Sequence, residues 1–280
     1  MRRGILPVVG SRITGVCRVP CARKPILIQP RFDVFRRRAL GRAIEAVDRL
    51  GKRVILRLDS GDAIIFEPRM TGLVLLAEPP TQEHRRFLLE LAGGTARRLW
   101  YWDRRGLGSV RLLSPRQFQS QLGQQKLGPD ALALTPERLR QRFCNSRRAI
   151  KVALLDQRGV AGIGNLYASE ILHLAGVHPQ QRCDRLTRKQ WQQLHAAVVE
   201  VLEAAIRLEG STLSDGTYRN ALNNPGGYQN HHRVYGRQGE RCSTCQQASV
   251  ERIVQAQRST FFCRSCQPKW PVGTRRKTTA

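Results

Sequence analysis

Acidic residues are scarce in this chain of 280 residues. Asp and Glu number 21 against 48 Lys and Arg, which leaves a formal net charge of +27. The excess is spread along the whole length and is not confined to a tail. Solubility does not require a charge this one-sided, so a polyanionic partner is the better explanation, and nucleic acid is the first candidate.

Long apolar runs are also missing. No stretch approaches the ~20 apolar residues of a membrane span, and no basic amphipathic helix stands out. The opening residues, Met1-Arg-Arg-Gly-Ile-Leu-Pro7, lack the apolar core of a signal peptide. We therefore expect no membrane partner and a reducing, cytoplasmic location.

Four of the eight cysteines form two CxxC pairs. Cys242 and Cys245 are followed after seventeen residues by Cys263 and Cys266. This spacing predicts one structural zinc ion held by four thiolates, with two disulfides or reduced core cysteines as the alternatives. The residues between the pairs predict a β-hairpin with Arg258 near its tip. A hairpin this small cannot bury a core, so the metal would supply its folding free energy.

The first 115 residues favour short strands. Alternating or apolar runs separated by turn residues predict strands at 11–19, 53–58, 63–67, 72–77, 86–91, 97–102 and 108–113. Asp59-Ser-Gly-Asp62 marks a hairpin, whereas 36–50 is interpreted as helix or loop. The pattern is typical of a β-sandwich.

The second half favours helices. Residues 116–130 are polar and rich in Gln, Gly and Pro, which predicts an interdomain linker. Thr135 and Pro136 mark a helix start, and helical patterns follow at 147–157, 165–175 and 187–207. The basic tail 271–280 is expected to be disordered. The fold class is therefore α+β and multidomain: a β-sandwich, a helical domain and a zinc-finger hairpin.

A glycine-rich segment lies between two of the predicted helices. Gly159, Gly162 and Gly164 permit tight turns, and Asn165 is expected to cap the helix that follows. A helix start of this kind offers unpaired N–H groups and a positive dipole end, which suit a phosphate. Taken alone, the segment is equally consistent with simple packing.

These features together resemble the formamidopyrimidine-DNA glycosylase family, which includes the endonuclease VIII branch. The similarity rests on Leu155–Glu170, Ala175–Pro179, Val234–Arg237 and Arg258–Cys263, and it extends over nearly the whole chain. It implies an N-terminal β-sandwich domain of the catalytic type with a truncated first helix (1–115), a linker (116–130), a helix–two-turn–helix domain (131–233), a zinc finger (234–270) and a basic tail (271–280).

The resemblance implies a base-excision-repair DNA glycosylase with AP lyase activity by β,δ-elimination. Its substrates would be 8-oxoguanine and formamidopyrimidines in damaged double-stranded DNA, and it would act as a monomer on the bacterial nucleoid. Residues 212–228 match the family's lesion-capping loop, which favours the formamidopyrimidine branch.

The resemblance also implies roles for individual residues. Arg258 would grip the phosphate beside the lesion and assist the second elimination, and Lys52 would assist the first. Asn165 would bind phosphate, Arg105 would pair with the orphaned base, and Met70 would fill the void left by the extruded nucleotide. Without the family, Lys52 would be interpreted as a solvated lysine and Met70 as a core residue. Further DNA-contacting positions match Leu107, His84, Arg147 and Lys151.

Three positions depart from the family pattern. Leu107 stands where the family usually has Phe, Glu67-Pro-Arg69 stands where it more often has His-Leu-Gly, and Gln257 replaces a Gly. These departures concern substrate preference and not the mode of binding.

The family's N-terminal Pro-Glu start has no counterpart here. Its proline amine attacks the sugar and its glutamate handles protons. Arg2-Arg3-Gly4 matches an Arg-Arg-Gly about nine residues further into the family's first helix, so Met1 is expected mid-helix. We favour a true start upstream of Met1, because Lys52 and Arg258 remain. The alternative is a non-catalytic damaged-DNA-binding paralogue. A chain starting at Met1 is expected not to be trapped by borohydride, and the upstream reading frame decides between the two.

A zinc-ribbon nucleic-acid-binding protein is a further alternative. It would account for the basic charge and the four cysteines. It would not account for the Gly162-Ile-Gly-Asn165 turn or for Arg258 between the cysteine pairs.

Overall fold

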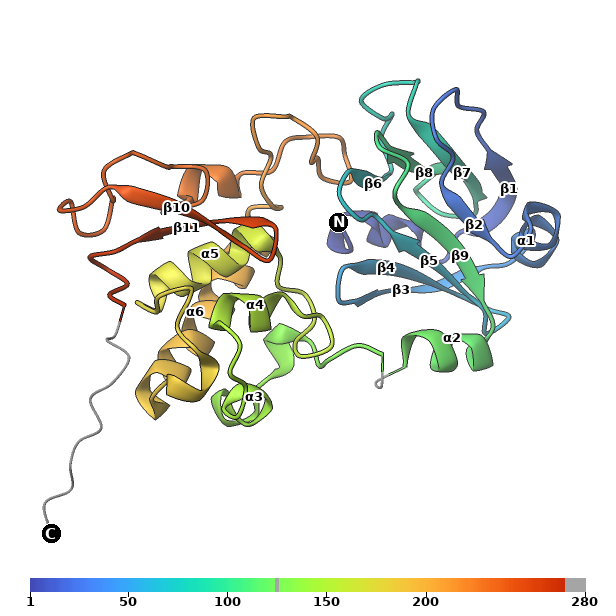
Figure 1. Ribbon diagram of the computed structural model, residues 1–280. Coiled ribbons are helices and arrows are strands. Elements are labelled where there is room, and N and C mark those ends of the chain that lie inside the picture. The colour runs from blue at the N-terminus through green and yellow to red at the C-terminus, as the bar shows by residue number, and fades with distance from the viewer. Residues whose placement is uncertain (124–125, 270–280) are drawn as a thin grey trace, which may run out of the picture. The chain divides into compact units, whose positions relative to one another are not determined.

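The computed structural model describes residues 1–123 and 126–269, which divide into two compact units. The first unit comprises Met1–Gly128 and Ala204–Asn230. The second comprises Pro129–Glu203 and the chain from His231 onward (Figure 1). The predicted tail 271–280 lies outside the described residues. Within the described ranges, no helix combines the length and apolar character needed to cross a membrane.

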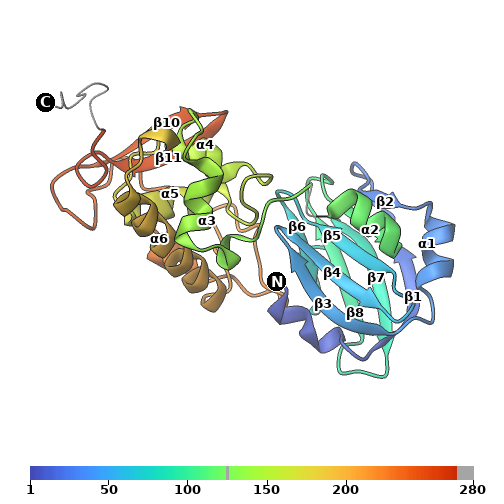
Figure 2. The same ribbon diagram turned by 90° about the horizontal axis from the view of Figure 1, so that it is seen from below.

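The first unit is a β-sandwich, as predicted (Figure 2). One sheet has the strand order β1-β7-β8-β6 and the other β2-β9-β5-β4-β3, and only the β2–β9 pair is parallel. The strands are β1 (Arg12–Arg18), β2 (Leu27–Gln29), β3 (Ile44–Leu50), β4 (Arg53–Leu58), β5 (Ala63–Glu67), β6 (Gly72–Leu75), β7 (Arg85–Ala92), β8 (Arg98–Asp103) and β9 (Ser109–Leu113).

The core of the sandwich follows from the alternation of side chains along each strand. On β4, Leu56 faces the main core, whereas its neighbour Ile55 faces the opposite side of the sheet. Phe66 of one sheet meets Phe87 of the other edge to face, with ring centroids 6.3 Å apart. Burial of each such side chain contributes about 1.5–3 kcal/mol.

The predicted linker contains a helix. α2 (Pro115–Leu122) begins at Ser114, whose side chain accepts from the backbone N–H of Gln117 in a complete capping box. Phe118 and Leu122 cover the outer face of the sheet beside Ile55. The segment is polar overall, but Phe118 and Leu122 lie four residues apart and pack on the sheet. The linker prediction was therefore wrong for residues 116–122.

The segment 36–50 was expected to be helix or loop, but much of it is a strand. It contains the end of α1 (Phe32–Ala39) and all of β3, with Gly41 in the left-handed turn between them at a φ of 77°. At the N-terminus, η1 (Arg3–Val8) is a 3-10 helix that starts two residues after Met1.

Residues 204–230 return to the first unit, although the predicted boundaries placed them with the helical domain. Ala221 joins the main core of the sandwich, and its carbonyl accepts from the backbone N–H of Leu76 at 2.8 Å. Asn223 Nδ2 donates to the carbonyl of Glu78 at 2.9 Å. The segment therefore completes the sandwich instead of extending the helical unit.

The second unit combines the predicted helices and hairpin. Its elements are η2 (Ala131–Ala133), α3 (Pro136–Phe143), α4 (Ile150–Leu155), α5 (Asn165–Leu174), η3 (Cys183–Arg185), α6 (Arg188–Arg207, which ends in the first unit), η4 (Tyr228–His231, which begins there), β10 (Val250–Gln255) and β11 (Arg258–Cys263). Thr135 caps α3 through its side-chain oxygen, as predicted. Ala256 and Gln257 form the two-residue turn between β10 and β11, and both have positive φ, as a type I′ turn requires.

Candidate functional site

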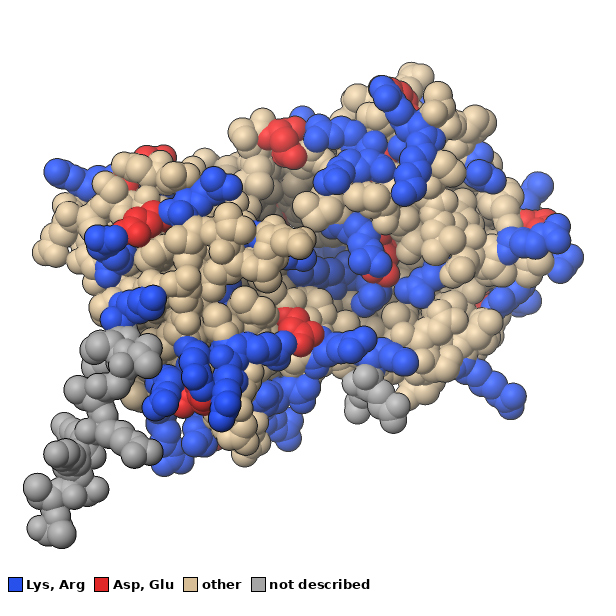
Figure 3. Space-filling view, viewed as in Figure 1, with Lys and Arg blue, Asp and Glu red and all other residues tan. Residues whose placement is uncertain are grey.

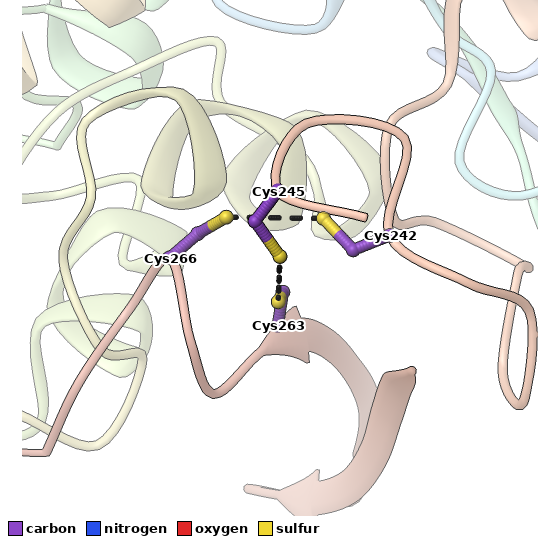
Figure 4. Close-up of side chains that lie close together, drawn as sticks. All are labelled: Cys242, Cys245, Cys263 and Cys266. Atoms are coloured by element: carbon purple, nitrogen blue, oxygen red, sulfur yellow. Dashed lines mark hydrogen bonds between the residues drawn. The ribbon is translucent and has the colours of Figure 1, made fainter. Parts of the chain in front are cut away.

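The four cysteines of the finger converge, as their spacing predicted (Figure 4). Their sulfur atoms all lie within 4.8 Å of one another, with 3.8 Å from Cys242 to Cys266 and 3.7 Å from Cys245 to Cys263. A disulfide requires about 2.05 Å. Tetrahedral zinc with bonds of about 2.3 Å places its sulfur ligands about 3.8 Å apart. The geometry therefore fits a metal ion and not two disulfides.

The cysteine thiols of this cluster do not shift alike, because burial raises the pKa of Cys263 and Cys266. The backbone N–H groups of Gln247 and Ala248 lower the pKa of the Cys245 thiol to about 6. The ring nitrogen Nε2 of His173, on α5, lies 3.6 Å from the sulfur of Cys242. Such contacts around the ligands orient them for a metal.

Two glutamines attach the finger to the segment after α5. Gln267 accepts from the backbone N–H of Cys263 at 3.1 Å and donates to the carbonyl of Val177 at 2.8 Å. Gln255 donates to the carbonyl of Pro179 at 3.2 Å. The hairpin is thus held against the helices of its own unit by side-chain hydrogen bonds as well as by the cysteine cluster.

Lys151 of α4 lies at the centre of a polar cluster beneath the hairpin. Its side chain is fully buried, and Nζ donates to Asn165 Oδ1 at 2.7 Å, to Thr260 Oγ1 at 2.6 Å and to the carbonyl of Ser259 at 3.0 Å. Burial, together with a smaller effect of the nearby Arg258 charge, lowers the pKa of Lys151 to about 8. The structure thus brings together Lys151, Asn165 and the backbone next to Arg258.

Asn165 does not cap α5, so that prediction was wrong. The N-cap is Gly164, and Asn165 is the first helical residue. Its side chain is engaged elsewhere, because Oδ1 accepts from Lys151 and Nδ2 donates to the carbonyl of Ser259 at 3.0 Å. No side chain caps the first N–H groups of α5. A helix start in this state suits an anion.

Arg258 occupies an exposed position at the start of β11, directly after the tight turn. The carbonyl of the next residue, Ser259, accepts from both Lys151 and Asn165. The backbone that carries Arg258 is therefore fixed to α4 and α5, while its guanidinium faces solvent.

Two residues that the sequence analysis did not single out organise this unit. Gln157 accepts from the backbone N–H of Gly162 and donates to the carbonyls of Leu155 and Ile163, which closes the glycine-rich turn. The position of Gln157 beside the glycine-rich turn could have indicated this role from the sequence. The fully buried Glu170 was the second omission. Its carboxylate accepts from three successive backbone N–H groups at 2.8–3.0 Å, those of Arg233, Val234 and Tyr235.

In the first unit, two loops meet beside Met70, whose side chain is 68% exposed. Thr71 Oγ1 donates to Asp103 Oδ1 and accepts from the backbone N–H of Arg105 at 3.1 Å. The buried Asp103 carboxylate also accepts from the N–H of Gly108 at 2.8 Å. These bonds hold the Met70 loop against the loop that carries Arg105 and Leu107.

The remaining predicted residues are Lys52, Arg147 and His84, and the carbonyl of His84 accepts from the backbone N–H of Asp103 at 3.0 Å. Lys52 is exposed in the turn between β3 and β4, and Arg147 is exposed between α3 and α4. The His84 side chain is 12% exposed and packs edge to face on Trp102, with ring centroids 5.4 Å apart. On the face shown in Figure 3, Lys and Arg side chains are spread over both units and outnumber the acidic side chains.

Comparison with known proteins gives matches over most of the chain. Residues 1–110 match the formamidopyrimidine-DNA glycosylase N-terminal domain, and residues 127–217 match the formamidopyrimidine-DNA glycosylase H2TH domain. The formamidopyrimidine-DNA glycosylase of Chloroflexus aurantiacus is 43% identical over 262 residues, which are 92% of this chain and 91% of that protein.

Solved structures of this family also match nearly the whole chain. A complex between a mutant Lactococcus lactis Fpg and a Fapy-dG containing DNA has a TM-score of 0.84 at 32% identity, covering 96% of this chain and 97% of that one. A complex between the Lactococcus lactis Fpg and an abasic site containing DNA has a TM-score of 0.84 at 31% identity, with the same coverage.

Proposed function

The chain belongs to the formamidopyrimidine-DNA glycosylase family, and on that premise we propose that it excises oxidised purines, such as 8-oxoguanine and formamidopyrimidines, from damaged duplex DNA. The observation that carries the proposal is the cluster of Lys151, Asn165 and Arg258 beside the uncapped start of α5. A relative crystallised with Fapy-dG DNA supports the substrate class.

The second unit supplies phosphate binding in this proposal. The α5 N-terminus offers backbone N–H groups, and Lys151 and Arg258 add positive charge close to Ser259. Asn165 holds Ser259 in place and lies at the helix start itself. Phosphates on both sides of the damaged nucleotide are the anions that we assign to this cluster, with Arg147 as a further contact.

The first unit supplies the wedge. An enzyme that acts on a base inside a duplex must extrude it, at a cost of a few kcal/mol in lost stacking and pairing. In this proposal the exposed Met70 and Leu107 would fill the vacated space, and Arg105, whose backbone N–H donates to Thr71, would pair with the orphaned base. We assign His84, which packs edge to face on Trp102, as a further DNA contact of this unit.

We assign the assistance of strand cleavage to Lys52 and Arg258. β,δ-Elimination requires proton transfers at the sugar and stabilisation of the leaving phosphates. An exposed ammonium and an exposed guanidinium suit those two tasks. We propose that the protein works as a monomer on the bacterial chromosome in the cytoplasm.

One structural zinc ion completes the proposal. Cys242, Cys245, Cys263 and Cys266 would hold it, and its contribution is to the folding of the hairpin that carries Arg258. No chemical step is assigned to the metal.

Lesion-selective binding tests the proposed function. Fluorescence anisotropy would compare a duplex containing a tetrahydrofuran abasic analogue with the intact duplex, at one salt concentration because salt governs both affinities. We expect at least about tenfold tighter binding to the modified duplex. Equal affinities would overturn the proposal and favour a zinc-ribbon protein without lesion recognition. Base release from 8-oxoguanine duplex by a protein that carries the family's Pro-Glu start, with none from undamaged guanine, would confirm the substrate class.

A further inference from the structure

Arg69, directly before Met70, has a backbone conformation that glycine adopts most easily. Its φ is 53°, in the left-handed region, where an L side chain carries a steric cost. Arginine has no local hydrogen bond to its own backbone that offsets this cost, unlike Asn or Asp. Arg69 therefore combines an unfavourable backbone conformation with a long cationic side chain.

The Arg69 guanidinium is held in one direction by Glu67. Its Nε lies 2.9 Å from Glu67 Oε1, and the Arg69 side chain remains 62% exposed. The other carboxylate oxygen, Oε2, accepts from Arg53 Nε at 3.0 Å and from Arg111 Nη2 at 3.4 Å. The side chains of Arg53 and Arg111 are much less accessible, at 20% and 14% exposed.

The charges in this group do not balance. Three arginines share one carboxylate, so three positive charges minus one negative charge leave an excess of two. Burial lowers the pKa of Arg111 most, and repulsion from Arg53 and Arg69 adds to the lowering. Glu67 would already be neutralised by Arg53 and Arg111, so its charge does not require the third arginine.

The loop does not require Arg69 for its shape either. The backbone N–H of Gly72 donates to the carbonyl of Pro68 at 2.8 Å, and Tyr101 Oη donates to the carbonyl of Glu67 at 3.1 Å. Thr71 is bonded to Asp103. Each of these contacts is independent of the Arg69 side chain, so the arginine is not there to build the turn.

We propose that Arg69 binds a phosphodiester of the DNA next to the Met70 wedge, with Glu67 as the residue that positions its guanidinium. The inference rests on the proposed function, because it takes Met70 as the wedge. A guanidinium is well suited to phosphate, since its planar donors match two phosphate oxygens. The anchor at Nε fixes the orientation of the guanidinium before DNA arrives, and the exposed face meets the phosphate.

The test is the salt dependence of DNA affinity in two variants, Arg69→Gly and Arg69→Gln, on the tetrahydrofuran duplex. Both remove the charge, but only Arg69→Gly also relieves the left-handed strain. We expect both to bind several-fold more weakly at low salt, and the slope of log K against log salt to fall by about 0.9. We expect the midpoint of thermal unfolding to stay the same or rise in Arg69→Gly, and not to rise in Arg69→Gln.

Arg37→Gln is the matched control, since it removes one exposed charge from α1 and is expected to leave the slope within error of wild type. Slopes of the Arg69 variants equal to those of wild type and Arg37→Gln would overturn this inference alone, provided wild type still prefers the tetrahydrofuran duplex. A wild type without that preference would overturn the proposed function itself. Unfolding curves identify any variant that loses affinity through misfolding.

Discussion

Asn165 donates a side-chain hydrogen bond to the backbone oxygen of Ser259 at 3.0 Å, across 94 residues of sequence. The bond joins the first residue of α5 to the strand of the finger, directly beside Arg258. Lys151 bonds to both partners, so three elements share one buried polar centre. The start of α5 and the strand that carries Arg258 are thereby joined directly.

Replacement of Lys151 by Met should destabilise the second unit. Asn165 Oδ1, Thr260 Oγ1 and the carbonyl of Ser259 would each lose a donor, and a buried polar group without a partner costs about 1–3 kcal/mol. Urea unfolding followed by circular dichroism measures the loss. The exposed Lys126→Met serves as control and should change the free energy of unfolding by less than about 0.5 kcal/mol. Equal stability of Lys151→Met and wild type would contradict the buried network.

The pKa of Lys151, lowered to about 8, predicts a pH dependence with a definite sign. A bound phosphate favours the protonated amine and raises this pKa, so DNA affinity should fall as pH rises through about 8. Stability should change in the opposite direction. Between about 8 and the ordinary lysine value of about 10.4 the unfolded chain binds more protons than the native one, so this group's cost to folding decreases as pH rises. Anisotropy titrations and urea unfolding at pH 7–9.5 measure both trends. The difference between wild type and Lys151→Met isolates the contribution of Lys151 to both trends. If DNA affinity and unfolding free energy depend on pH in the same way in the two proteins, the lowered pKa does not belong to Lys151.

Loss of one finger cysteine should remove the metal and the DNA binding together. Cys263→Ser breaks the four-thiolate cluster, whereas the exposed Cys17→Ser on β1 leaves it intact. We expect about one zinc per chain in Cys17→Ser and none in Cys263→Ser, by a colorimetric zinc-release assay. The lesion-duplex affinity of Cys263→Ser should fall by at least about tenfold, because Arg258 loses its support. Zinc retained in full by Cys263→Ser would exclude the cluster as the metal site.

Truncation of the wedge should affect DNA and not the fold. Met70 is 68% exposed, so Met70→Ala should change stability by less than about 0.5 kcal/mol. Binding to the tetrahydrofuran duplex should weaken about tenfold, since less apolar surface fills the void. Leu40→Ala, in the same unit and 42% exposed, is the matched control and should bind as wild type does. Comparable losses in the two variants would argue against a wedge.

Local sequence patterns predicted the elements that local interactions create. The turn Asp59–Asp62 marked the β4–β5 hairpin, and the CxxC spacing marked the cysteine cluster. β2 was missed because it has three residues and pairs in parallel with β9, about eighty positions away. α2 was missed because only two of its residues are apolar enough to signal a buried face, although its capping box was present.

The sequence placed several residues of these clusters among its predicted site residues, but it did not predict the hydrogen bonds that join them. Lysine is almost never fully buried, so no pattern marks Lys151 as the centre of a network. The capping role expected of Asn165 follows local rules, and a partner 94 residues away overrides them. Met70, Arg105 and Leu107 gather through Thr71 and Asp103, which pair across 32 positions and carry no motif of their own.

The return of residues 204–230 to the first unit has a consequence for how the protein is made. Ala221 fills the core of the sandwich, and its carbonyl holds the edge at Leu76. During synthesis, the sandwich cannot close its core until residue 230 has left the ribosome, by which time α3, α4 and α5 have all emerged. A single cut in the chain therefore does not separate the two units. A fragment ending at Gly128 would expose apolar surface that Ala221 covers in the whole protein. A chimera that exchanges one unit between relatives would have to move residues 204–230 together with the sandwich.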